Sequence, residues 1–142
     1  MKRLARCLTL LLAANLPAYA VTKDVPPPPG PIVGKWTWTR AENNCTEVYD
    51  YRADGTLLVV SGEEESSSTY RLSARPDAGG FHELKGQPMR TNGRQDCSDS
   101  PPTGELSPYT VYVIFHTREP KMLVCQTPAL DQCFGPLRRI DP

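Results

Sequence analysis

From Gly34 onward, apolar and polar residues alternate with a period of two, and no stretch has the period of a helix. Successive side chains of a β-strand point to opposite faces of the sheet, so this alternation predicts half-buried strands. Gly, Pro, Asp and Asn separate the alternating stretches, as is typical of tight turns. The expected strands span residues 35–40, 46–52, 56–61, 69–74, 81–85, 109–117, 122–126 and 133–140.

Eight short strands joined by turns have few ways to protect their edges. An open sheet leaves unpaired backbone groups on each edge strand, whereas an up-and-down barrel gives every strand two neighbours. We therefore predict an all-β fold with a single antiparallel up-and-down barrel of about eight strands. A β-sandwich is the alternative. Two connections are expected to be polar loops, Gly62–Ser67 and the long Gln87–Ser107.

The first twenty residues have the features of a secretory signal peptide. Three Lys or Arg residues precede a short apolar stretch, and Ala18-Tyr19-Ala20 is typical of a cleavage site. The mature protein is then expected to be periplasmic or secreted, without a membrane span, and monomeric. We predict a signal peptide at 1–20, a proline-rich linker at 21–33 and a barrel domain at 34–142.

Cleavage of that peptide changes the charge balance. The whole chain carries 16 Lys or Arg and 16 Asp or Glu residues. Lys2, Arg3 and Arg6 lie in the predicted signal peptide, so the mature chain keeps 13 basic against 16 acidic residues, a net charge of −3. A weakly acidic protein of this kind gives no support for nucleic acid or an anionic membrane as its partner.

The cysteines indicate disulfides. Cys7 is lost with the signal peptide, and an even number in an exported chain then predicts two bridges. The spacings of 51, 27 and 7 intervening residues contain no C-x-x-C pair that would favour a metal site. Of the three pairings, we favour the one in which the last two cysteines close a hairpin. The favoured bridges are Cys125–Cys133 and, by elimination, Cys45–Cys97.

Several residues resemble those of lipocalins and their small exported bacterial lipocalin-like (calycin-type) relatives. Gly34-Lys35-Trp36 opens the first strand as the G-x-W motif opens lipocalins, and residues 47–56 are similar to a y-f-x-x-D-G-T hairpin. In lipocalins a basic residue near the C-terminus covers the motif Trp. The resemblance therefore implies a barrel floor built from Gly34, Trp36 and either Arg138 or Arg139, with a cation–π contact to the indole.

Aromatic residues are placed where they would meet inside such a barrel. An eight-stranded barrel is just wide enough for side chains to fill it or for one small ligand to enter. The rings therefore either line a binding cavity or close the interior, and the sequence leaves both open. The candidate lining residues are Trp38, Tyr49, Tyr51, Tyr70 and Tyr112.

Catalytic chemistry finds little support. His82 and His116 lie in expected strands without a carboxylate at a fixed spacing, which does not make a metal site. The serine-rich stretches contain no G-x-S-x-G motif. We therefore predict that the protein is not an enzyme and has no cofactor and no metal.

Two functional hypotheses remain. The first is an exported lipocalin-like protein that binds a small apolar or amphipathic ligand in its interior, which predicts a cavity of about 300 Å³ or more. The second is a module that binds an extracytoplasmic protein, such as a protease or lysozyme inhibitor, through exposed loops. The long 87–107 loop favours the second hypothesis, because Cys97 and Pro101-Pro102 would stiffen it and lower the cost of ordering on binding.

Overall fold

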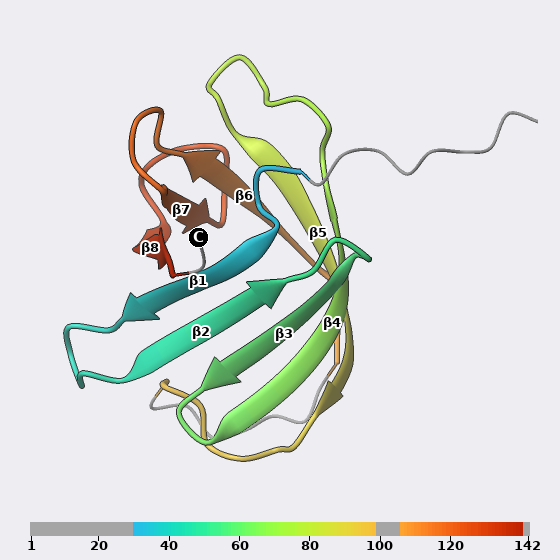
Figure 1. Ribbon diagram of the computed structural model, residues 1–142, viewed down its shortest axis with the longest axis vertical. Helices are drawn as coiled ribbons and strands as arrows, with labels where there is room; N and C mark the ends of the chain where they lie inside the picture. The colour runs from blue at the N-terminus through green and yellow to red at the C-terminus, as the bar shows by residue number, and fades with distance from the viewer. Residues whose placement is uncertain (1–29, 99–105, 141–142) are drawn as a thin grey trace, which may run out of the picture.

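The structure is a computed structural model that describes residues 30–98 and 106–140. It confirms the all-β barrel and excludes the sandwich: eight antiparallel strands pair in chain order into one closed barrel (Figure 1). The expected signal peptide and most of the expected linker lie outside the described residues. Within the described residues, no helix is long and apolar enough to cross a membrane. The strands are β1 (Gly34–Thr39), β2 (Thr46–Tyr51), β3 (Thr56–Ser61), β4 (Glu64–Leu72), β5 (His82–Thr91), β6 (Tyr109–Phe115), β7 (Lys121–Cys125) and β8 (Cys133–Arg139).

The expected loops are shorter than predicted. Residues 64–67 were expected in a polar loop but belong to β4, and residues 87–91 were expected in the long loop but belong to β5. Ser66 and Ser68 pair with Val59 and Leu57 of β3 and so face the interior with them. An inward face made of hydroxyls gives no apolar alternation, and for that reason the pattern of the sequence missed this part of the strand.

One end of the barrel, here called the floor, is closed by Ile32, Trp36 and Arg139. Trp36 Nε1 donates a 2.8 Å hydrogen bond to the carbonyl of Ile32. The sequence predicts Ile32 in the linker, but this residue is buried, with 1% of its surface exposed. The Arg139 guanidinium lies 4.6 Å from the centroid of the Trp36 ring. It also donates 2.8 Å hydrogen bonds to the carbonyls of Val33 and Pro31. The chain before β1 is thus folded under the barrel and tied to its last strand.

The floor half of the interior is densely filled. Residues from seven of the eight strands meet there, and each is at most 4% exposed. Trp36 contacts this cluster from β1 and also packs against Phe115 of β6, with ring centroids 6.2 Å apart. Close packing of this kind supplies most of the apolar stabilisation of a small domain. The cluster comprises Ile32, Trp36, Tyr51, Leu57, Leu84, Val113, Met122, Val124 and Leu137.

Replacement of Arg139 by Ala is expected to lower the free energy of unfolding by about 2–4 kcal/mol. The change removes two hydrogen bonds from a charged donor and the cation–π contact with Trp36. Arg138, which precedes Arg139 in the same strand but is exposed, is the matched control, and its replacement by Ala is expected to cost less than about 0.5 kcal/mol. Denaturant unfolding of the two variants makes the comparison, and equal losses would contradict the assignment of the floor contact to Arg139.

Candidate functional site

Four of the five candidate aromatic residues point into the barrel, where each packs against another aromatic ring. The Tyr51 and Tyr70 ring centroids are 5.1 Å apart in an edge-to-face arrangement, and Trp38 lies 5.1 Å from Phe134 of β8. Tyr49 lies 6.5 Å from Tyr51. These separations are those of ordinary aromatic pairs in protein cores. The arrangement favours the interpretation in which the rings fill the barrel.

The fifth candidate, Tyr112, does not point into the interior. Val111 and Val113 of β6 face the interior, so Tyr112 between them lies on the outer face, opposite Glu83 of β5. Nearly every residue of this strand is apolar or aromatic, which gives the alternation of the sequence no polar side to mark as outside. Tyr112 therefore takes no part in the interior.

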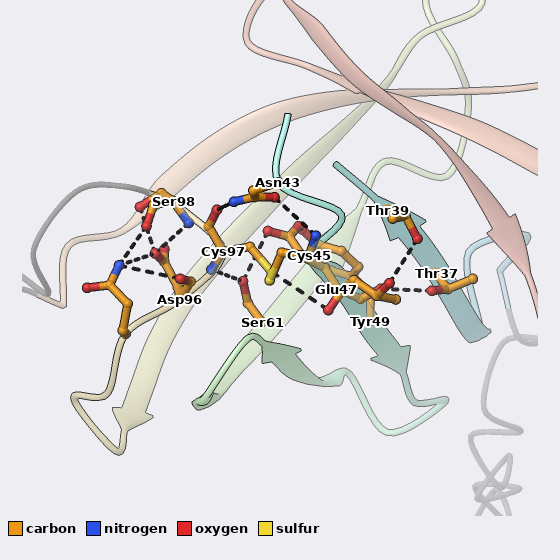
Figure 2. The surroundings of a disulfide bond; sticks show 12 residues. Thr37, Thr39, Asn43, Cys45, Glu47, Tyr49, Ser61, Asp96, Cys97 and Ser98 are labelled. Atoms are coloured by element: carbon orange, nitrogen blue, oxygen red, sulfur yellow. Dashed lines mark hydrogen bonds between the residues drawn. A yellow bond between two sulfur atoms is a disulfide. The ribbon is translucent and has the colours of Figure 1, made fainter. Parts of the chain in front are cut away.

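A buried carboxylate lies at the other end of the interior, here called the mouth and defined by Glu47 and Ser61. Glu47 is 7% exposed and accepts hydrogen bonds from Tyr49 Oη at 2.5 Å and from Ser61 Oγ at 3.0 Å. Ser61 Oγ accepts a hydrogen bond from the backbone N–H of Cys97 at 3.0 Å. Figure 2 shows this network beside the Cys45–Cys97 disulfide. It ties β2, β3 and the segment after β5 together at the mouth.

That segment, residues 92–98, is held along the mouth. Its Gln95 carbonyl accepts a hydrogen bond from the Glu63 N–H at 3.0 Å, and Asn43 Nδ2 donates to the Cys97 carbonyl at 3.0 Å. Gly62 has a φ of 58° and lies close to residues 95 and 96, where a Cβ atom would be 3.2 Å from their backbone. The β3–β4 turn thus needs a glycine both for its backbone conformation and for contact with the segment.

Both favoured disulfides are present. Cys45–Cys97 joins the mouth segment to the chain just before β2, and Cys125–Cys133 joins the end of β7 to the start of β8. The second bridge closes the loop of residues 126–132, in which Leu130 is 67% exposed. In the described part of the chain, no three His, Cys, Asp or Glu residues gather as a metal-binding group.

An apolar groove of about 480 Å³ lies on the outside of the barrel beside this loop. Ile114 of β6 and Leu123 of β7 are cross-strand partners that alternate with inward residues, so both face out. The rest of the apolar lining comes from Phe115, Met122, Leu130 and Pro136. His116 and Lys121 lie at the end nearer the floor. The groove is therefore apolar along its length and polar at one end.

A break in the strand pairing accounts for this hollow. Met122 pairs with Leu137 and Val124 pairs with Phe134, which leaves Leu123 opposite Gly135 and Pro136 without a ladder partner on β8. Proline has no N–H to donate, so the ladder cannot close at this point. A bulge of this kind bends the strand and redirects its side chains.

The groove was not predicted from the sequence, although a signal for it is present. The stretches "YTVYVIFHT" and "KMLVC" carry apolar residues on both faces of their strands. In a barrel with a solvent-exposed exterior, apolar outward residues on two adjacent strands indicate an apolar surface patch.

Charged groups gather at the floor end of the groove. Lys121 Nζ forms an ion pair with Glu119, and the side chains of these two residues are 23% and 49% exposed. The hydrogen bond from Lys121 holds the pKa of the Glu119 carboxyl below its usual value, with further contributions from the charges of Lys121 and Arg138. Arg138 is the cross-strand partner of Lys121 and faces outward with it.

The two histidines have different surroundings. His82 Nδ1 lies 2.9 Å from the Ser73 carbonyl, and its ring packs edge-to-face against Phe115. His116 Nδ1 accepts hydrogen bonds from the backbone N–H groups of Arg118 and Glu119 at 3.2 and 3.0 Å. The neutral ring of His116 therefore carries its proton on Nε2.

That the protein is not an enzyme stays a prediction.

The fold and its bridges define the class of protein: a small disulfide-bonded, eight-stranded antiparallel barrel. No protein-family model, curated protein or solved structure matches this chain. The barrel is consistent with a lipocalin-like fold, and the resemblance to lipocalins rests on that fold and on the motif residues given above.

The inward tyrosines are expected to make stability depend on alkaline pH. Burial, and for Tyr49 also the Glu47 carboxylate, raises the pKa of Tyr49 and Tyr51 above the usual value of about 10. Above that pH the unfolded chain ionises both phenols and the folded chain does not, so the free energy of unfolding falls as pH rises and is unaffected below it.

Denaturant unfolding across this pH range and phenolate absorbance test the expectation. Tyr51→Phe is expected to reduce the slope of stability against pH. If all the tyrosines ionised near pH 10 while the protein stayed folded, the buried placement of these two rings would be wrong.

Proposed function

We propose that this protein binds a small amphipathic ligand in the outer groove between β6, β7 and β8. The observation that carries the proposal is the groove itself, whose volume of about 480 Å³ falls in the range of small-molecule sites. Its lining is apolar, with a few polar groups at one end, which is the usual division between affinity and orientation in such sites. The ligand therefore lies outside the barrel, and not in the interior where the sequence led us to expect it.

The groove wall is pre-organised. Cys125–Cys133 closes the loop that carries Leu130, and the Gln126 N–H donates a 2.9 Å hydrogen bond to the Gln132 carbonyl across the base of the same loop. A wall that is fixed before binding lowers the entropic cost of association. The interior offers less support for a ligand, because its floor half is filled, its aromatic rings pack on one another and residues 92–98 are tied along its mouth.

The setting of this activity is outside the cytoplasm. Two disulfides fit an extracytoplasmic protein, since cytosolic thiols are kept reduced. We propose that the signal peptide directs the chain to the periplasm or beyond and that the mature protein acts there as a non-enzymatic binding protein.

Leu130→Asp is expected to weaken the binding of a neutral apolar fluorophore, N-phenylnaphthylamine, by about tenfold or more, because a carboxylate in the groove wall must be desolvated by an apolar ligand. Leu130 is 67% exposed, so the fold is expected to survive. Met89→Asp, at a residue of β5 that is 49% exposed and does not line the groove, is the matched control and is expected to leave the fluorescence titration unchanged. Equal binding by the wild type and both variants would remove the groove as the site.

Capture of another protein is the second candidate function. It is favoured by the stiffness of the mouth segment, which the disulfide, the Ser61 contact and the Asn43 contact hold in one conformation. Residues 99–105, one part of the Gln87–Ser107 loop first singled out, lie outside the described residues. Native mass spectrometry of the oxidised protein from its own compartment separates the two functions: a small added mass supports the groove, and a stoichiometric complex with a second protein supports the mouth segment.

A further inference from the structure

The groove is polarised along its length. Ile114, Leu123 and Leu130 form an apolar stretch, whereas His116 and Lys121 lie at the floor end. A ligand that satisfies both parts has one apolar chain and one polar head, and the head must lie at the floor end. The chemistry of that end then decides which head groups the groove accepts.

Positive charge is in excess at the floor end. Lys121 and Arg138 are adjacent on the outer face of β7 and β8, and both act on the Glu119 carboxylate. Lys121, Arg138 and Glu119 thus bring two cations and one carboxylate together, and the next carboxylate, Glu42, lies in the hollow on the β1 side of Arg138. Arg118, in the exposed turn after β6, adds a further cation to the same connection.

His116 contributes a donor to this end in either protonation state. Its Nδ1 is occupied by the backbone N–H groups of residues 118 and 119, so the neutral ring carries a proton on Nε2. In the protonated ring Nε2 also carries a hydrogen. The polar end of the groove thus offers hydrogen-bond donors from His116 and Lys121, which line it. Arg138 and Glu119 lie beside Lys121, just outside the lining.

The Glu119 side chain shows that a carboxylate is stable beside Lys121. Its carboxylate is paired with Lys121 and stabilised by the neighbouring positive charges, while its own side chain is 49% exposed. An exposed side chain in a turn has little to lose by moving into solvent. A carboxylate that arrives from the groove can take its place between Lys121 and Arg138 without any change in the strands.

We propose that the groove selects an anionic amphiphile: a single alkyl chain with a terminal carboxylate, the chain against Leu123 and Leu130 and the carboxylate between Lys121 and Arg138. This inference rests on the proposed function and goes further by naming the charge of the ligand. The occupant is a free amphiphile molecule, and the surface of a lipid bilayer is the competing source of the same chemistry.

The first test compares three amphiphiles with the same chain, the two ionic ones below their micelle-forming concentrations and the alcohol below its solubility limit. Isothermal titration calorimetry of the oxidised protein with dodecanoate, dodecanol and dodecyltrimethylammonium varies the head charge alone. Dodecanoate is expected to bind about tenfold more tightly than dodecanol, as for a hydrogen bond to a charged group. The cationic amphiphile is expected to bind most weakly.

Substitutions at the floor end should change affinity in opposite directions. Lys121→Gln and Arg138→Gln are each expected to weaken dodecanoate binding by about tenfold and to leave dodecanol binding unchanged. Glu119→Gln removes the competing carboxylate and is expected to strengthen dodecanoate binding by several-fold. The exposed Lys85–Glu83 ion pair on the outer face of β5 supplies matched controls, since Lys85→Gln and Glu83→Gln should have no effect on either ligand.

The outcomes distinguish failure of the charge selection from failure of the groove as a binding site. If dodecanoate and dodecanol bind equally, or the cationic amphiphile binds best, the charge selection is overturned while the groove stands. If none of the three binds, both the groove and the charge selection fail. If vesicles of phosphatidylglycerol bind the protein and dodecanoate does not, the occupant is a lipid surface and the proposal of a free amphiphile is wrong.

Discussion

The closure of β8 on β1 is the interaction on which the rest of this structure depends. Two residue pairs, Trp36 with Arg139 and Thr37 with Arg138, give both strands a second neighbour. The same strand end supplies the guanidinium that holds the chain before β1 in place. The contact combines backbone pairing, a cation–π contact and hydrogen bonds to the carbonyls of the entering chain, so the barrel seam and the floor form one unit.

Much of this architecture could be predicted because its signals lie in short stretches of the sequence. Alternation fixed the number of strands, and turn residues such as Asp54 and Gly55 fixed the first hairpins. The even cysteine count gave the two bridges. The signals failed where inward residues are polar, as at Ser66 and Ser68 of β4, or where both faces are apolar, as around Tyr112 of β6.

The candidate site shows why the remainder could not be predicted. The groove depends on a bulge opposite Pro136 and on the position of a loop carrying Leu130, and both are products of tertiary pairing. A period of two tells which residues share a face, but it does not tell where a ladder breaks. The same limit applies to Glu47, whose hydroxyl partners include Ser61 on the neighbouring strand.

The two disulfides differ in what they constrain. Cys45–Cys97 spans 52 residues and Cys125–Cys133 spans 8, so in the chain-entropy model the longer bridge stabilises by about 1–2 kcal/mol more. The shorter bridge acts mainly on the local shape of the groove wall. A chain in which Cys125 and Cys133 are reduced lacks one of the two ties, the disulfide and the Gln126–Gln132 hydrogen bond, that hold this wall. On the function proposed here, ligand binding therefore depends on the redox state of these two cysteines and is weaker wherever thiols are kept reduced.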